Sequence, residues 1–390
     1  MSPGAIGEST QAVPPALEGV WGRIMDLDSH LMVPYRRFGT ALGTTGRLVG
    51  PITSRLLRRN PEAAKSGDPS EEAPVGPSTV WTVKGAAAPG GMHAESRVRA
   101  LDLMGIRHQL VFADVLAAMI GWGRQPGALD AMRSHNDYAL DWASDGAGRL
   151  HPVAILNTRQ LGPALEEAGR LAGKGARAVM IADGVLPGGQ SPAHPDVDRL
   201  WAALAEAGIA VLLHVGGQAG FASIKWEQTE LLRTRVKNLG SDGDPIGPHV
   251  LATMHLSPVN YLSALIFGGV LERHPSLKIG VMELGAMWVG PMAELLDNRA
   301  RFSTRVGTTL SMRPSEYIRR NLRVTAFWQE PVGEIIDRYD LGGVICFATD
   351  FPHREGGTDP LGATSFSLAA RDRTTFERFY VSNASLIISG

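Results

Sequence analysis

Residues 194–217 read HPDVDRLWAALAEAGIAVLLHVGG and contain one complete transition from helix to strand. The stretch 197–207 predicts a helix that ends at Gly208, because glycine is a common stop signal just after a helix. The apolar run 210–215 that follows is short and predicts a buried strand. A helix that leads directly into a buried strand is half of a βαβ unit, so this stretch predicts a parallel sheet covered by helices.

The same transition recurs along most of the chain. Short apolar runs predict strands at 24–30, 109–113, 153–156, 178–181, 210–215, 278–282, 324–327 and 344–348. Predicted helices lie over 95–104, 129–144, 163–172, 197–207, 260–273, 314–321 and 331–339. Eight strands alternating with helices predict an α/β fold, a single closed (β/α)8 barrel of the TIM type, rather than an open doubly wound sheet. No GxGxxG motif follows the first run, which argues against a dinucleotide-binding fold.

The composition limits the class of protein. The 390 residues are 44% hydrophobic, enough for a large core, and 38 basic against 39 acidic residues give a formal charge of -1. A chain without a basic excess is not expected to bind nucleic acid or an anionic membrane surface. The single Cys346 fits a reducing compartment. Neither a signal peptide nor a membrane span of about 20 apolar residues is expected, so we predict a cytoplasmic protein.

Two regions lie outside the repeating pattern. Residues 1–20 are rich in Pro, Gly and Ser and are expected to form a flexible N-terminal arm. Residues 21–390 then form the barrel, with an irregular insertion at about 39–95. The insertion directly follows the first strand, so it should leave the barrel on the side of the active site and lie near the barrel mouth.

Polar side chains follow four of the predicted strands at the point where each apolar run stops. These residues are Asp28, His30, His214, Glu283 and Asp350. The carboxyl ends of the strands form the active-site face of such a barrel, and alternation along the first strand turns Asp28 and His30 the same way. Carboxylates that share a partly buried site are unfavourable unless a cation offsets them, so the pattern predicts a divalent metal ion.

Other residues near the predicted strand ends are weaker candidates. Trp122, Phe327 and Trp328 are expected to wall a substrate pocket, although core packing explains them equally well. His353 follows the Phe-Pro turn after the last strand and is a further candidate for contact with the substrate, with a plain surface loop as the alternative.

Four stretches resemble a known family. They are DLDSHLMVP at 26–34, the segment 262–290 and FATDFPHREGG at 347–357, and the helix-to-strand stretch at 194–217 belongs with them. Together they resemble the amidohydrolase-related family typified by aminocarboxymuconate semialdehyde decarboxylase, including its resorcylate decarboxylase branch. The resemblance extends from about residue 24 to residue 384. It implies a (β/α)8 barrel with metal ligands at the strand ends.

The resemblance also implies roles for individual residues. The family's metal ligands fall on Asp28, His30, His214 and Asp350, where Asp28 replaces a more usual His. The catalytic His of many decarboxylases falls on Glu283, so a carboxylate stands where an imidazole is common. We therefore expect Glu283 and Asp350 to be catalytic and one divalent ion to be bound. Mixed imidazole and carboxylate ligands suit Zn²⁺ first, with Mn²⁺ or Fe²⁺ as alternatives.

The expected activity is nonoxidative decarboxylation of a small organic or aromatic carboxylic acid. The main alternative is a hydrolase for an amide, a lactone or an activated C–C bond, in which a carboxylate takes the proton of a metal-activated water. A non-catalytic binding protein on the same fold is a minor alternative. A small-molecule substrate is the expected partner, and the dimers common among related decarboxylases lead us to expect a homodimer.

Overall fold

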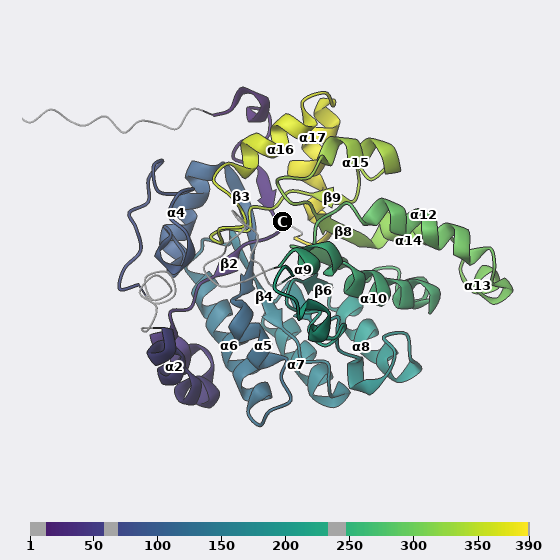
Figure 1. Ribbon diagram of the computed structural model, residues 1–390, viewed down its shortest axis with the longest axis horizontal. Coiled ribbons are helices and arrows are strands. Elements are labelled where there is room, and N and C mark those ends of the chain that lie inside the picture. Colours follow the sequence, from purple (N-terminus) through teal and green to yellow (C-terminus); the bar gives the residue numbers. More distant parts are fainter. Residues whose placement is uncertain (1–12, 58–68, 233–246, 389–390) are drawn as a thin grey trace, which may run out of the picture.

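The strands are buried at most of their residues and form the inner ring of the molecule (Figure 1). The computed structural model describes residues 13–57, 69–232 and 247–388. Its strands are β1 (Ile24–Asp26), β2 (His30–Leu31), β3 (Ile106–Ala113), β4 (Leu150–Ile155), β5 (Ala178–Ile181), β6 (Ala210–His214), β7 (Ile279–Met282), β8 (Leu322–Thr325) and β9 (Ile345–Cys346). Every residue of β5 and β6 is buried, as expected for parallel strands covered on both faces.

The strands follow one another around the ring in chain order. Neighbours pair in parallel from β1 through β3 to β9, and β2 also pairs with β3. The ring closes where the Leu27 amide donates to the Phe347 carbonyl at 3.2 Å and Ser29 forms a parallel bridge with Phe351. The predicted (β/α)8 barrel is therefore confirmed. The first predicted strand is the exception, because the run 24–30 is divided into β1 and β2.

Helices surround this ring on the outside (Figure 1). They are α1 (Phe38–Ala41), α2 (Gly43–Leu57), α4 (Ala94–Met104), α5 (Val115–Gly121), α6 (Ala128–Ser144), α7 (Leu161–Gly173), α8 (Pro195–Glu206), α9 (Pro248–Thr253), α10 (Leu256–Phe267), α11 (Val270–Arg273), α12 (Val289–Ala300), α13 (Thr304–Thr309), α14 (Pro314–Asn321), α15 (Val332–Tyr339), α16 (Pro360–Leu368) and α17 (Arg373–Tyr380). At the end of α4, Gly105 has a φ of 69°, and a side chain there would collide with the Trp21 ring. Glycine is therefore required at this turn.

The predicted insertion at 39–95 is more regular than expected. Residues 43–57 form helix α2, which we did not predict because its glycines and Pro51 hide the periodicity. The Thr44 amide of α2 donates to Asp130 of α6 at 3.3 Å. Farther along, the Gly85 amide donates to the Pro352 carbonyl at 2.9 Å, next to the loop that carries Asp350. Part of the predicted insertion, 58–68, lies outside the described residues.

The predicted N-terminal arm is described only from residue 13 onward, and 1–12 lie outside the described residues. Within the described part, Leu17 and Val20 are buried in the main core. Residues 13–20 therefore pack against the barrel at these two side chains.

Helices α9 and α10 follow one another over Pro248–Phe267, 20 residues with a mean hydropathy of 1.4 in their most apolar window. By length and composition alone this segment is able to cross a membrane, which corrects the expectation that no stretch comes close. It is weak evidence for a membrane span, because a core helix passes the same test, and 39% of the window is buried in the protein.

Replacing Trp201 tests the packing of the helices on the barrel. Its side chain on α8 is fully buried, and its indole N–H donates to the Pro192 carbonyl at 2.7 Å. We expect Trp201→Ala to lower the free energy of unfolding by about 3–5 kcal/mol, measured by urea denaturation, because the change leaves a large cavity. The exposed Trp226 is the matched control, and Trp226→Ala should change the free energy of unfolding by less than about 0.5 kcal/mol. Equal effects of the two changes would contradict this packing.

Candidate active site at the carboxyl ends of the strands

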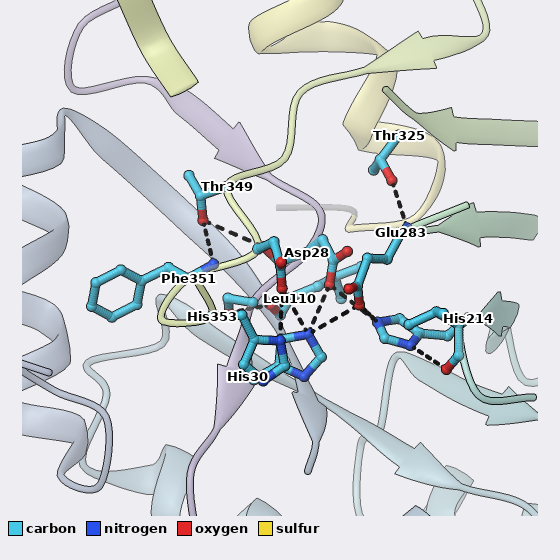
Figure 2. A network of polar contacts seen from close by, with 12 residues as sticks. Asp28, His30, Leu110, His214, Glu283, Thr325, Thr349, Phe351 and His353 are labelled. Carbon is cyan, nitrogen blue, oxygen red and sulfur yellow. Dashed lines mark hydrogen bonds and ion pairs between the residues drawn. The ribbon is translucent and has the colours of Figure 1, made fainter. Parts of the chain in front are cut away.

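Two imidazoles and three carboxylates converge at the centre of the barrel mouth. Figure 2 shows the side chains of Asp28, His30, His214 and Glu283 turned toward one another. His30 Nε2 lies 3.2 Å from Asp350 Oδ1 and 3.6 Å from both Asp28 Oδ1 and Glu283 Oε2. His214 Nε2 lies 3.4 Å from Asp28 Oδ1 and 3.3 Å from Glu283 Oε2. All five residues predicted from the strand ends therefore meet in one place.

Four of these residues stand at or after the end of a strand, and His30 begins the short strand β2. Asp28 follows β1, His30 begins β2, His214 ends β6, Glu283 follows β7 and Asp350 comes four residues after β9. The Asp350 amide donates to the Asp28 carbonyl at 2.9 Å, and the Glu283 amide donates to the Thr325 hydroxyl at 3.2 Å. These backbone contacts fix the strand ends against one another.

Glu283 and Asp350 share an uncommon backbone conformation. Their φ angles are 55° and 52°, in the left-handed region that most side chains avoid. Such strain is concentrated at functional sites, where the surrounding structure holds it in place. The two residues expected to be catalytic are therefore also the two strained positions of this site.

Behind the site lies a buried hydrogen-bond network centred on Asp26. Its Oδ1 accepts from the Thr349 amide at 2.9 Å and from the Asp28 amide at 3.2 Å. Its Oδ2 accepts from the Thr349 hydroxyl at 2.5 Å and from Gln109 Nε2 at 2.7 Å. These hydrogen bonds lower the pKa of the Asp26 carboxyl, but burial outweighs them and raises it to about 7. One carboxylate thus connects β1, β3 and the segment after β9.

Arg97 extends this network and was missed in the sequence. Its guanidinium is fully buried and donates to Gln109 Oε1 at 2.9 Å, to the His30 carbonyl at 2.7 Å and to the Gly90 carbonyl at 2.6 Å. The signal was available: Arg97 lies on α4 three residues after Ala94 and four before Leu101, on the buried face of the helix. A charged side chain at such a position requires buried partners.

Burial and mutual charge displace the pKa values of the central groups. Burial raises the pKa of Glu283 well above its usual range, and the carboxylates of Asp350 and Asp28 raise it further. Burial alone would raise the pKa of Asp350, but the imidazoles of His353 and His30 outweigh it and hold that pKa below its usual range. Burial and the charge of His30 lower the pKa of His353, yet Asp350 outweighs both and raises it to about 9.

The donor atoms form two overlapping groups that are close enough to hold one metal ion. The first is Asp28, His30, His214 and Glu283, and the second is His30, Glu283, Asp350 and His353; within each group the donor atoms lie within 4.8 Å of one another. The four predicted ligands therefore lie close together. Three of them, Asp28, His30 and His214, form one group with Glu283, whereas the fourth, Asp350, belongs to the group that contains His353. His214 Nδ1 lies 3.0 Å from the Val215 carbonyl, which turns Nε2 toward the centre.

Neighbouring donor atoms bound to a common ion at about 2.0–2.2 Å lie about 2.8–3.1 Å apart in an octahedron and about 3.3–3.6 Å apart in a tetrahedron. The separations of 3.2–3.6 Å around His30 Nε2 and His214 Nε2 match this spacing. In addition, His30 Nε2 and Glu283 Oε2 are buried and make no hydrogen bond to any part of the chain that the structure describes. The donor set therefore fits a divalent cation.

Two cavities meet at Glu283. A small one is lined by His30, His214, His353 and Trp122, whose indole is buried. The larger has a volume of about 940 Å³ and is lined by Phe327 and Trp328. The four weaker candidates of the sequence analysis are thus divided between the two cavities. His353 is not on an open loop, since its ring stacks on His30 with centroids 3.8 Å apart.

Changing Asp26 tests how firmly the network holds the site. Asp26→Asn turns one oxygen into an N–H₂ group that faces the donors of Gln109 and Thr349, so we expect a loss of about 1–3 kcal/mol in the free energy of unfolding. Chemical denaturation monitored by fluorescence measures it. Asp141→Asn on the exposed face of α6 is the matched control and should change the free energy of unfolding by less than about 0.5 kcal/mol. A loss no larger than that of the control would show that the network does not stabilise the barrel.

Solved structures with the same fold include several enzymes. An amidohydrolase from Mycobacterium avium subsp. paratuberculosis has a TM-score of 0.67 and 20% identity, covering 94% of this chain and 99% of that one. The 2,6-dihydroxybenzoate decarboxylase from Rhizobium has a TM-score of 0.61 and 15% identity, with coverages of 94% and 98%. The 5-carboxyvanillate decarboxylase from Novosphingobium aromaticivorans, solved with bound manganese, has a TM-score of 0.62 and 16% identity, with coverages of 95% and 97%.

The sequence itself matches a family along most of its length. No curated protein matches the chain. The family model described as amidohydrolase matches residues 83–385, which contain β3 to β9 together with His214, Glu283 and Asp350. Asp28 and His30 precede the matched range, and the structure places them beside these three residues. The chain belongs to the amidohydrolase family.

Proposed function

We propose that this protein is a metal-dependent decarboxylase that removes the carboxyl group of an organic or aromatic acid without an oxidant. The observation that carries the proposal is the convergence of two imidazoles and three carboxylates with the spacing of ligands around one ion. Two kinds of structural neighbour, the dihydroxybenzoate and carboxyvanillate decarboxylases, support this reaction over others.

Asp28, His30, His214 and Asp350 would hold the ion. Zn²⁺ suits this mixed donor set, and Mn²⁺ is the alternative favoured by the manganese in two of the neighbours. A bound divalent cation supplies Lewis-acid stabilisation of negative charge on the substrate. His353 forms an ion pair with Asp350 at 2.9 Å and positions that carboxylate.

Glu283 is the group that moves the proton. Of the two described residues that line both cavities, Val215 and Glu283, only Glu283 has an ionisable side chain. It faces the large cavity, where a substrate has room, as well as the metal-side donors. The C–C bond to the carboxyl group breaks, its electron pair stays on the substrate carbon, and that carbon takes a proton from Glu283 while CO₂ leaves. Glu283 then regains a proton from solvent.

A hydrolase is the second candidate. The same donors and the same carboxylate are also suited to proton removal from water during attack on an acyl carbon. A coupled assay for CO₂ distinguishes the two reactions, with 2,6-dihydroxybenzoate and 5-carboxyvanillate as the first compounds tested. Release of CO₂ would support decarboxylation. Turnover of esters, lactones or amides without release of CO₂ would show instead that the protein is a hydrolase. A homodimer and a cytoplasmic location stay predictions.

Metal binding is testable without a substrate. A divalent ion at 100 times its Kd stabilises the folded state by about 2.7 kcal/mol, which raises the unfolding midpoint of a chain of this length by about 3 °C. Differential scanning fluorimetry of chelator-treated protein with added Mn²⁺ or Zn²⁺ should show this shift. His214→Ala should remove it, whereas the exposed His93→Ala should retain it. The same shift in both variants would refute the metal site.

Glu283→Gln separates the two possible roles of this residue. If Glu283 moves the proton, the variant should keep its metal, by elemental analysis, and lose about 10²–10⁴-fold in kcat, because the amide cannot donate a proton in this way. If it is a ligand instead, metal content should fall together with activity. Glu294→Gln on the exposed face of α12 is the control. Normal metal content with normal turnover would leave Glu283 a structural residue.

A further inference from the structure

The large cavity next to Glu283 is mainly apolar. It extends between α10 and α12, which are neighbours in the fold (Figure 1). Its hydrophobic lining includes Met254, Leu256, Trp288, Leu295, Phe327 and Trp328. Cavities of about 300–1,000 Å³ enclose ligands of drug size, so a volume of about 940 Å³ is near the upper end. An acid with a single small ring would leave most of this apolar surface in contact with water.

The charges of the lining limit what the cavity can bind. None of the described residues that line it is Lys or Arg, so they offer no guanidinium or ammonium group to a second anionic group. The carboxylate of Glu330 is already engaged, because it accepts the amides of Ala286 and Phe327 at 2.9 Å each. The part of the ligand in this cavity should therefore carry no second anionic group, since an unpaired charge in an apolar site is unfavourable. The other titratable groups of the lining are Glu283, Glu355 and His255, and the remaining walls are mainly apolar.

Apolar side chains also continue out to the mouth of the cavity. Leu256, Met287 and Leu295 line it and remain 45%, 59% and 49% exposed. We call these three side chains the hydrophobic rim of the cavity, because they belong to its lining and are also accessible to solvent. Exposed apolar surface of this kind marks a place where a ligand or partner binds. The rim is continuous with the inner end of the cavity at Glu283, so a ligand that reaches from the reacting carbon to the rim covers both.

We propose that the substrate is an acid with an extended, uncharged hydrophobic part, such as a biaryl or alkyl-substituted aromatic acid. Its only anionic group faces the cluster of Asp28, His214 and Glu283, and its hydrophobic part lies between α10 and α12. This inference rests on the proposed function, because it takes the carboxyl group to be bound at that cluster.

A series of metal-binding probes tests the length of the hydrophobic part. Benzohydroxamic acid and its 4-phenyl, 4-butyl and 4-hexyl derivatives share one chelating group and differ only in apolar length. Binding to Mn²⁺-loaded protein is measured by isothermal titration calorimetry. A fully buried methylene is worth about fourfold in affinity, so with partial burial the hexyl compound should bind at least about 30-fold tighter than the parent. A 4-carboxy derivative should bind no better than the parent.

Three variants locate the effect. Leu256→Lys and Leu295→Lys change half-exposed positions, so both should fold, and each should remove most of the gain of the hexyl compound while the parent compound binds as before. Leu48→Lys on α2 is the matched control, because Leu48 is 69% exposed and is absent from the cavity lining; it should leave the whole series unchanged.

The possible failures are distinguishable. Equal affinity for all four probes, or a gain that survives both rim variants, would overturn the proposed substrate class while leaving the metal site intact. Tighter binding of the 4-carboxy derivative would overturn it as well. Failure of the protein to bind Mn²⁺, together with no binding of any probe, would refute the proposed function itself.

Discussion

The carboxylate of Asp26 joins the first strand of the barrel to the segment that follows the last strand. It accepts two hydrogen bonds from Thr349 and one from the backbone of Asp28, and through Gln109 it reaches the guanidinium of Arg97. The same few bonds therefore close the ring and fix the segments that carry Asp28, His30 and Asp350. A barrel that failed to close at this seam would also lose its site, since the converging residues come from both sides of it.

The convergence itself is unfavourable in the absence of a cation. Three carboxylates lie buried around two imidazoles, and burial works against the charged form of each group. The fold maintains the arrangement because parallel strands bring all their carboxyl ends to one face, while the helices outside supply the hydrophobic stabilisation. The site is thus stabilised by parts of the molecule that do not touch it.

Much of this was predictable from local patterns. Alternation placed Asp28 and His30 on one side of the first strand, and the rule that strand ends meet brought in His214, Glu283 and Asp350. Arg97 was not predicted because a lone Arg in a helix is usually solvated, and nothing in the sequence shows that Gln109 lies opposite it. Helix α2 was missed because tertiary contacts with α6 outweigh its weak propensity.

The large cavity could not be predicted for a different reason. Its walls come from α10, α12 and the residues after β8, segments that are distant in sequence and meet only through packing. Aromatic residues such as Phe327 and Trp328 were expected near a pocket, but their partners on the helices have the ordinary apolar pattern of a core. Only the folded arrangement shows which apolar side chains leave a space between them.

The left-handed backbone at Glu283 constrains how this corner of the barrel can evolve. Asn, Asp and His adopt that conformation more readily than other side chains, and β-branched residues seldom do. Glu283 holds this conformation with a φ of 55°, although Glu is not among the residues that adopt it readily. A substitution at this position must therefore first be compatible with the left-handed backbone, and only then does the reactivity of the new side chain matter. Val, Ile and Thr are strongly disfavoured there for conformational reasons alone.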